Sequence, residues 1–258
     1  MLSLLGRDPR LLWWLPTAIA ILFSWPLLSY AGEVKVAVAS NFMQPMKEIA
    51  TQFERDTRHS VVLAFGSSGK FYAQINHGAP FDVLLSADQA KPSALSASGL
   101  AVADSQFTYA LGAIVLWSAT PKDGADLLAD LKAGQFNKLA FANPKLAPYG
   151  AAALEVLQHL SLQAATQPKW VQGENIAQTY QFVRTGNADL GFVARAQLAP
   201  EDLAFAWSVP KSFYGPIRQD AVLLQRGAAN PAASELMRYL RSDAVKAILK
   251  KYGYDADA

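Results

Sequence analysis

The chain has 258 residues, a formal net charge of +2 from 23 basic and 21 acidic residues, and a hydrophobic content of 52%. This composition allows a substantial core in one domain or two modest ones, and it excludes a disordered tail. The balanced charge and the lack of a basic stripe argue against a nucleic-acid partner. Cysteine is absent, which excludes cysteine-bound zinc, iron–sulfur clusters and a thiol nucleophile.

The first 31 residues have the pattern of a secretory signal peptide. Two arginines precede an apolar run over 11–28, and the small residues Ser29 and Ala31 follow it. A basic start with a small–x–small end favours cleavage after Ala31. A membrane anchor is the alternative, because the run approaches the roughly 20 residues that span a bilayer, but two prolines in the run argue against it. We therefore predict an exported mature chain.

The mature chain opens with alternating strand and helix patterns. Short apolar, largely β-branched runs predict strands over 34–39, 61–65 and 82–85. Between them, apolar residues at helical spacing predict a helix over 42–53 and a shorter one with Phe71 and Ile75 on one face. A β-α-β-α-β order is typical of a mostly parallel sheet covered by helices.

A second unit of the same kind follows. Its predicted strands lie over 113–117, 139–142 and 190–193, and its predicted helices over 154–160 and 176–183. A single C-terminal helix is predicted over 236–249. No low-complexity linker separates the units, which favours two α/β lobes joined through strands. Ligands bind at the carboxyl ends of the strands in such sheets, which here means a cleft between the lobes.

Small polar residues stand where the predicted strands meet helices. The corners are Ser40 with Asn41 and Ser67 with Ser68 in the first unit, and Tyr149 with Gly150 and Asn175 with Ile176 in the second. A helix N-terminus offers free backbone N–H groups and about half a positive charge, and glycines at 66 and 69 allow close approach of a ligand. The four corners are consistent with an anion site of neutral donors. For each single Ser or Asn, a simple helix cap is the alternative interpretation.

Motifs for catalysis are incomplete. Residues 66–70 resemble the end of a phosphate-binding P-loop, but Phe71 stands where that motif needs a hydroxyl residue. No G-x-S-x-G elbow is present. Asp82 and Asp88 form a possible carboxylate pair that nothing links to a nucleophile. The sequence therefore favours a binding protein over an enzyme, and an enzyme would require a base in the cleft and turnover of a bound anion.

Ordered segments over the whole mature chain resemble one family. They are 36–42, 46–53, 65–75, 78–89, 141–144, 148–150, 173–176, 188–193, 239–242 and 251–253. In this order and spacing they resemble the periplasmic molybdate-binding proteins of ABC importers. The resemblance implies a two-lobed periplasmic-binding-protein fold of type II, each lobe a mostly parallel sheet flanked by helices. It places lobe I in 32–112 and 211–258, and lobe II in 113–210.

The resemblance also implies the ligand and its partners. Molybdate, and tungstate with it, would be held by Ser40, Asn41 and Ser68 of lobe I and by backbone N–H groups of Tyr149 and Ile176 of lobe II. No cofactor and no direct metal ligand is implied, because the metal is bound as an oxyanion. The implied partner is the membrane permease of an ABC importer, and the protein itself is expected to be a monomer.

Two positions bear on this expectation. Other members of the family carry a ligand tyrosine where this chain has Ala194, and Asn41 is the natural substitute for that contact. Lys70 adjoins the site and is expected to face solvent. Sulfate, another oxyanion or a small carboxylate remains the alternative ligand, and an essential arginine in the cleft would favour a carboxylate.

Overall fold

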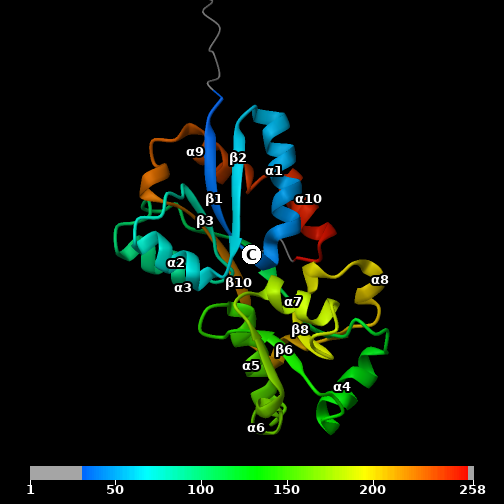
Figure 1. Ribbon diagram of the computed structural model, residues 1–258. Coiled ribbons are helices and arrows are strands. Elements are labelled where there is room, and N and C mark those ends of the chain that lie inside the picture. Colours follow the sequence, from blue (N-terminus) through cyan, green and yellow to red (C-terminus); the bar gives the residue numbers. More distant parts are fainter. Residues whose placement is uncertain (1–30, 255–258) are drawn as a thin grey trace, which may run out of the picture. The chain divides into compact units, whose positions relative to one another are not determined.

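The computed structural model describes residues 31–254 (Figure 1). The predicted signal peptide therefore lies outside the described residues, apart from Ala31 at its end. The described chain forms two five-stranded sheets with the strand orders β2-β1-β3-β10-β4 and β7-β6-β8-β5-β9. No helix within 31–254 has the length and apolar character needed to cross a bilayer.

The first sheet is mixed, with three neighbouring parallel strands and one strand, β10, that runs in the opposite direction. Strand β1 (Glu33–Ala39) pairs in parallel with β2 (Ser60–Gly66) and β3 (Val83–Leu85), while β10 (Ile217–Leu223) runs antiparallel between β3 and β4 (Phe107–Gly112). Its helices are α1 (Met43–Thr57), α2 (Ser68–Asn76), α3 (Ala90–Ala97), α9 (Pro231–Tyr239) and α10 (Asp243–Lys251).

Alternation along β1 explains how these helices divide between the two faces. Val34, Val36 and Val38 are buried in one cluster with α1, α9 and α10, whereas Ala37 is buried in another with α2 and α3. Successive side chains of a strand point to opposite faces, so both faces of the sheet are covered. In Figure 1, α1 and α10 lie side by side against the first sheet.

The second sheet repeats this arrangement. Strand β6 (Leu139–Ala142) pairs in parallel with β7 (Trp170–Gly173) and β8 (Leu190–Ala194), and β5 (Ile114–Trp117) runs antiparallel between β8 and β9 (Trp207–Ser208). Side chains of α4 (Gly124–Ala133) and α5 (Pro148–His159) pack with one face and those of α7 (Ile176–Arg184) with the other. Two short helices, α6 (Gln163–Thr166) and α8 (Pro200–Leu203), complete this lobe.

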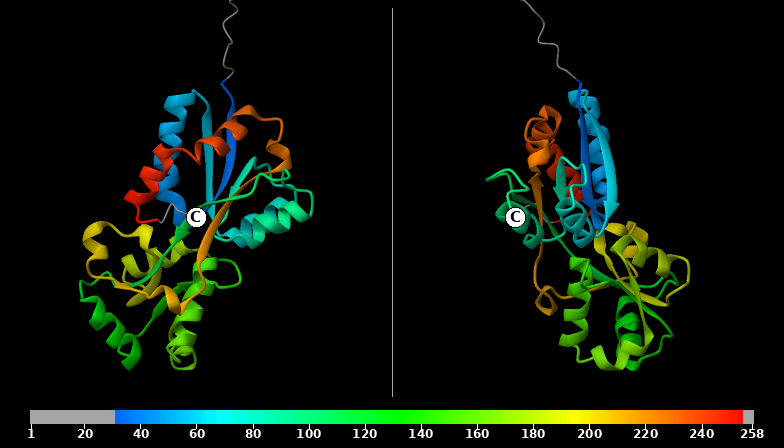
Figure 2. Two further views of the ribbon diagram at one scale, coloured as in Figure 1. Left: turned by 180° about the vertical axis from the view of Figure 1, so that it is seen from behind. Right: turned by 60° about the vertical axis from the view of Figure 1, so that its left-hand side comes forward.

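Two stretches of chain join the sheets. Only Ala113 separates β4 of the first sheet from β5 of the second. The return runs from β9 to β10, and the register of the β10–β4 pair begins with Ile217 opposite Gly112. Figure 2 shows β10, in orange, rising from the second sheet into the first. The outward connection is thus almost continuous strand, whereas the return over 209–216 contains only the 3₁₀ turn η4 (Lys211–Phe213) before β10 begins.

Two local predictions are wrong. The predicted C-terminal helix is divided into α9 and α10, because Ser242 caps a new helix there by accepting a hydrogen bond from the backbone N–H of Val245 at 3.4 Å. Ser40 and Asn41 do not cap α1 but lie inside a short 3₁₀ turn, η1 (Ser40–Phe42), that precedes it.

Candidate functional site

Four helix starts meet at one small cavity between the two sheets. Turn η1 and helix α2 come from the first sheet, and α5 and α7 come from the second. The cavity is lined by Ala39, Ser40, Asn41, Gly66, Ser67, Ser68, Ala87, Ala147, Pro148, Tyr149, Asn175 and Ile176. All five residues predicted as ligands are in this set. Their convergence is a feature of the structure, and their role as ligands stays a prediction.

The hydroxyl group of Ser68, in lobe I, accepts one hydrogen bond and keeps its own proton for another. Ser68 is the first residue of α2, and its Oγ accepts a hydrogen bond from the backbone N–H of Ala87 at 2.9 Å. A hydroxyl has one proton to donate, and this bond leaves that proton available for a ligand in the cavity. Ser67, the residue before it, is the true cap of α2, with the N–H of Lys70 3.4 Å from its Oγ.

Ser40 and Asn175 link η1 to the start of α7. Asn175 caps α7 by accepting from the N–H of Gln178 at 3.0 Å, and the Ser40 hydroxyl donates to the same Asn175 Oδ1 at 3.2 Å. The N–H of Ala177 in turn lies 3.4 Å from Ser40 Oγ. Rotation of the hydroxyl redirects its proton from Asn175 to the cavity. Asn175, absent from the predicted ligand set, therefore shapes the site as both a cap and a wall residue.

The backbone contributes further donors. Tyr149 and Ile176 lie in the first turns of α5 and α7, where N–H groups have no partner within the helix. Helix α5 begins directly against the end of β6, because Gly150 has no side chain. A Cβ there would lie 2.0 Å from the carbonyl oxygen of Ala142. This close approach places the N–H of Tyr149 at the cavity wall.

The electrostatic character of the cavity is that of neutral donors. Among the described residues that line it, none is charged, and helix starts add partial positive charge. Its volume is about 10 Å³, close to the roughly 10–15 Å³ that one water molecule needs. No group of three or more His, Asp or Glu side chains suited to a metal ion occurs among residues 31–254. An uncharged cavity lined by donors suits a small, fully deprotonated anion, which requires a wider cavity than this one.

The Asn41 side chain is already engaged within the protein. Its Nδ2 donates to Gln219 Oε1 at 2.6 Å and to Tyr254 Oη at 3.0 Å, which uses both amide protons. The side-chain amide of Asn41 therefore has no proton left for a ligand in this arrangement. Ala194 ends β8 in a buried position and is not among the residues lining the cavity.

Direct bonds also join the lobes beside the cavity. Lys70 Nζ lies 2.6 Å from Glu174 Oε1, with the two side chains 51% and 45% exposed. Lys70 is half-exposed to solvent and also pairs with Glu174 across the cleft, a contact that the sequence did not predict. The N–H of Gly69 donates to the carbonyl of Leu146 at 2.9 Å. An exposed ion pair contributes about 0–1 kcal/mol, so this pair adds little to the stability of the contact between the lobes.

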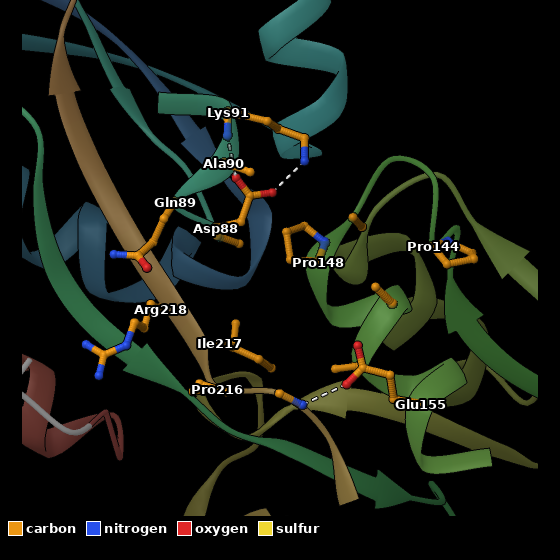
Figure 3. A pocket seen from close by; sticks show the side chains of 15 residues that line it. Asp88, Gln89, Ala90, Lys91, Pro144, Pro148, Glu155, Pro216, Ile217 and Arg218 are labelled. Atoms are coloured by element: carbon orange, nitrogen blue, oxygen red, sulfur yellow. Dashed lines mark hydrogen bonds and ion pairs between the residues drawn. The ribbon is translucent and has the colours of Figure 1, made fainter. Parts of the chain in front are cut away.

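A larger pocket of about 350 Å³ lies next to the cavity and shares Ala87, Ala147 and Pro148 with it (Figure 3). Its charged side chains have mixed signs and are mostly engaged. Asp88 pairs with Lys91 at 2.5 Å, and Glu155 accepts from the N–H of Gly215 at 2.7 Å. The pocket therefore lacks the uniform donor character of the smaller cavity, and Asp88 forms no carboxylate pair for catalysis.

Buried tyrosines surround the Asn41 side chain. Burial raises the pKa of Tyr109 and of Tyr149 well above the ordinary value of 10.0, and it raises the pKa of Tyr254 to about 12. The protein environment disfavours their phenolate forms. The tyrosines behind the site are thus neutral hydrogen-bonding groups at physiological pH.

A loss of stability at alkaline pH is the expected consequence. In the unfolded chain a tyrosine ionises near pH 10, whereas folded Tyr254 holds its proton to about pH 12. The stability this group contributes is present below pH 10 and lost as the pH rises to 12, at about 1.4 kcal/mol per pH unit. Urea unfolding at pH 9–12 measures this slope. Tyr254→Phe should make the slope shallower, and an unchanged slope would contradict the assignment.

Fold and site together define the protein as a two-lobed binding protein of the periplasmic type II class. The model of the family of bacterial extracellular solute-binding proteins matches residues 34–255, and the chain belongs to this family.

Named relatives agree with this assignment. The chain is 52% identical over 227 residues to the molybdate-binding protein ModA of Azotobacter vinelandii, with 87% of this chain and 90% of that protein covered. It is 48% identical over 238 residues to ModA of Rhodobacter capsulatus, with 92% and 94% covered. The solved periplasmic molybdate-binding protein of Azotobacter vinelandii matches with a TM-score of 0.82 at 37% identity, over 87% of this chain and 100% of that one. The predicted family resemblance and two-lobed α/β fold are confirmed.

Proposed function

We propose that this protein captures molybdate in the cavity between its lobes and delivers it to an ABC importer. The observation that carries the proposal is the meeting of four helix starts, with their neutral N–H and O–H donors, at one uncharged cavity. The ModA relatives support molybdate as the ligand. No arginine is among the described residues lining the cavity, so nothing there favours a small carboxylate.

The donor set explains why molybdate suits the site better than other oxyanions. Molybdate is a fully deprotonated dianion at neutral pH, and it needs donors without an acceptor. Phosphate carries a proton and would require a carboxylate to accept it. Sulfate is smaller, so a cavity that fits molybdate leaves its bonds long. Tungstate has nearly the size and charge of molybdate, and we expect the protein to bind both.

The proposed role is transport rather than catalysis. Closure of lobe I (32–112 and 211–258) on lobe II (113–210) buries the anion and forms the surface that the permease recognises. Lys70–Glu174, Gly69–Leu146 and Ser40–Asn175 are among the bonds that join the lobes beside the cavity. In this proposal the protein acts as a periplasmic monomer, released by cleavage after Ala31, and it uses no cofactor.

Ser68→Ala tests the proposed site. The variant loses one hydroxyl donor to the anion and the acceptor for the N–H of Ala87. A hydrogen bond to a charged group is worth about 1.5–3 kcal/mol, so calorimetry should show molybdate binding weakened by about 10- to 100-fold.

Ser242→Ala is the matched control for Ser68→Ala. It removes a serine cap from α10, away from the cavity, and it should lower stability by about 1 kcal/mol without changing the affinity for molybdate. Unchanged binding by Ser68→Ala would place the ligand elsewhere.

A further inference from the structure

A cluster of buried polar side chains lies behind the cavity. Its members are Asn41, Tyr109, Tyr149, Gln219 and Tyr254, each at most 4% exposed. Asn41 and Tyr149 line the cavity from opposite lobes. Gln219 does not line it, yet this side chain is hydrogen-bonded to both. No local feature of the sequence around Gln219 indicates such a role.

The bonds of Gln219 fix its orientation. Oε1 accepts from Asn41 Nδ2 at 2.6 Å and from the Tyr109 hydroxyl at 3.2 Å, and Nε2 donates to the Tyr149 hydroxyl at 3.5 Å. Gln219 itself is 0% exposed, and a buried amide is costly unless such bonds are made. The amide therefore cannot flip without placing donor against donor at Asn41.

The backbone around Gln219 leaves room for the hydrogen bonds that link its side chain to Asn41 and Tyr149. Gln219 lies on β10, the strand that returns from the second sheet, beside an irregularity in its pairing with β4. The neighbouring glycine on β4 makes room for the contact. A Cβ on Gly112 would lie 2.2 Å from the Tyr149 hydroxyl and 3.0 Å from Gln219 Nε2. The joining strands β4 and β10 thus hold Gln219 and the glycine beside it, between Asn41 of η1 and Tyr149 of α5.

We propose that Gln219 is a positioning residue of the anion site, which sets the spacing between Asn41 of lobe I and Tyr149 of lobe II. The inference rests on the proposed binding of an oxyanion by this cavity. The bond to Asn41 is short and lies within lobe I, whereas the bond to Tyr149 is long and crosses to lobe II. The second bond is the one that forms or breaks as the lobes move, so Gln219 matches the donor spacing to the size of the anion.

Gln219→Met tests the proposal, because methionine keeps the length of the side chain and removes its hydrogen bonds. The readout is the ratio of molybdate to sulfate affinity, measured by calorimetry with each sodium salt. We expect molybdate binding to weaken about tenfold and sulfate binding to change less, so that the ratio falls. A merely structural role would lower the melting temperature and scale both affinities together.

Two further variants make the outcome decisive. Gln106→Met is the matched control, since Gln106 donates to Asp220 on the same strand at 2.7 Å and lies outside the cavity wall, and its ratio should equal that of the wild type. If Gln219→Met does not fold, Tyr109→Phe removes one bond to Gln219 and should lower the ratio by about threefold. An unchanged ratio in the folded variant overturns the proposal. Failure of the wild-type protein to bind molybdate would instead overturn the proposed function.

Discussion

Asn175→Asp is expected to abolish oxyanion binding and to leave the fold intact. The substitution is nearly isosteric, and aspartate caps a helix as well as asparagine does. Its carboxylate accepts from the N–H of Gln178, as Asn175 does now at 3.0 Å, and it suits the positive end of α7. Thermal unfolding of the variant should therefore match that of the wild type.

The negative charge introduced by Asn175→Asp repels an anion in the cavity. Asn175 lines the cavity, and two unit charges 4 Å apart interact by about 4 kcal/mol near a protein surface. A dianion doubles this repulsion, so calorimetry should show molybdate affinity lowered by at least about a thousandfold.

Asn230→Asp provides the control. Asn230 caps α9 in the same way, accepting from the N–H of Ala232 at 3.1 Å, but it lies outside the cavity wall. This variant should bind molybdate like the wild type. Retention of tight binding by Asn175→Asp would show that the ligand is not an anion in this cavity.

Gly150→Ala is the second substitution with a large expected effect. The added Cβ would lie 2.0 Å from the Ala142 carbonyl oxygen and 2.7 Å from its carbon. Both are backbone atoms of β6, so α5 must move away from the sheet. Overpacking of this kind costs about 1–3 kcal/mol of folding stability. The movement also displaces the N–H and the hydroxyl of Tyr149, and we expect molybdate affinity to fall by about a hundredfold or more.

Gly215→Ala is the control for Gly150→Ala. It shows whether replacing a glycine by alanine lowers the affinity or the melting temperature by itself. A Cβ at Gly215 would meet only Glu155 Oε2, at the ordinary distance of 3.7 Å. Affinity and melting temperature of this variant should stay close to those of the wild type. If Gly150→Ala folds and binds molybdate as tightly as the wild type, the start of α5 does not contribute to the binding site.

The convergence of the site residues could be predicted from the sequence because the relevant signals are local. Strand patterns over 34–39 and 61–65 end at small polar residues, and β1 and β2 run in parallel. Parallel strands bring their carboxyl ends to one edge of a sheet, so Ser40 and Ser68 had to lie near each other. The two helix starts of the second lobe follow from the same reasoning.

Contacts between distant segments left no such signal. The partners of the Asn41 side chain are 178 and 213 residues away in the chain, and Lys70 pairs with a residue 104 positions on. Neither periodicity nor spacing encodes these contacts. The family resemblance implied Asn41 as the substitute for the tyrosine missing at Ala194, whereas in the structure the Asn41 amide donates to Gln219 and Tyr254.

The sequence does contain a signal for the break in the predicted C-terminal helix. The apolar positions from Leu236 to Leu249 fit a single helix, but Ser242 followed by Asp243 is a strong start signal for a new one. In the structure Ser242 caps α10 as this signal predicts. A local cap here outweighs hydrophobic periodicity, which cannot distinguish one long helix from two helices in register.

Calorimetric titration of the purified protein with molybdate, tungstate, sulfate and phosphate tests the central claim most directly. The neutral donor cavity predicts tight one-to-one binding of molybdate and tungstate, weaker binding of sulfate, and no measurable binding of phosphate, which lacks an acceptor for its proton there. Tight binding of phosphate, or binding of sulfate in place of molybdate, would contradict the account. The fold would stand, and the donor spacing set by Ser40, Ser68 and Tyr149 would then have to serve a different anion.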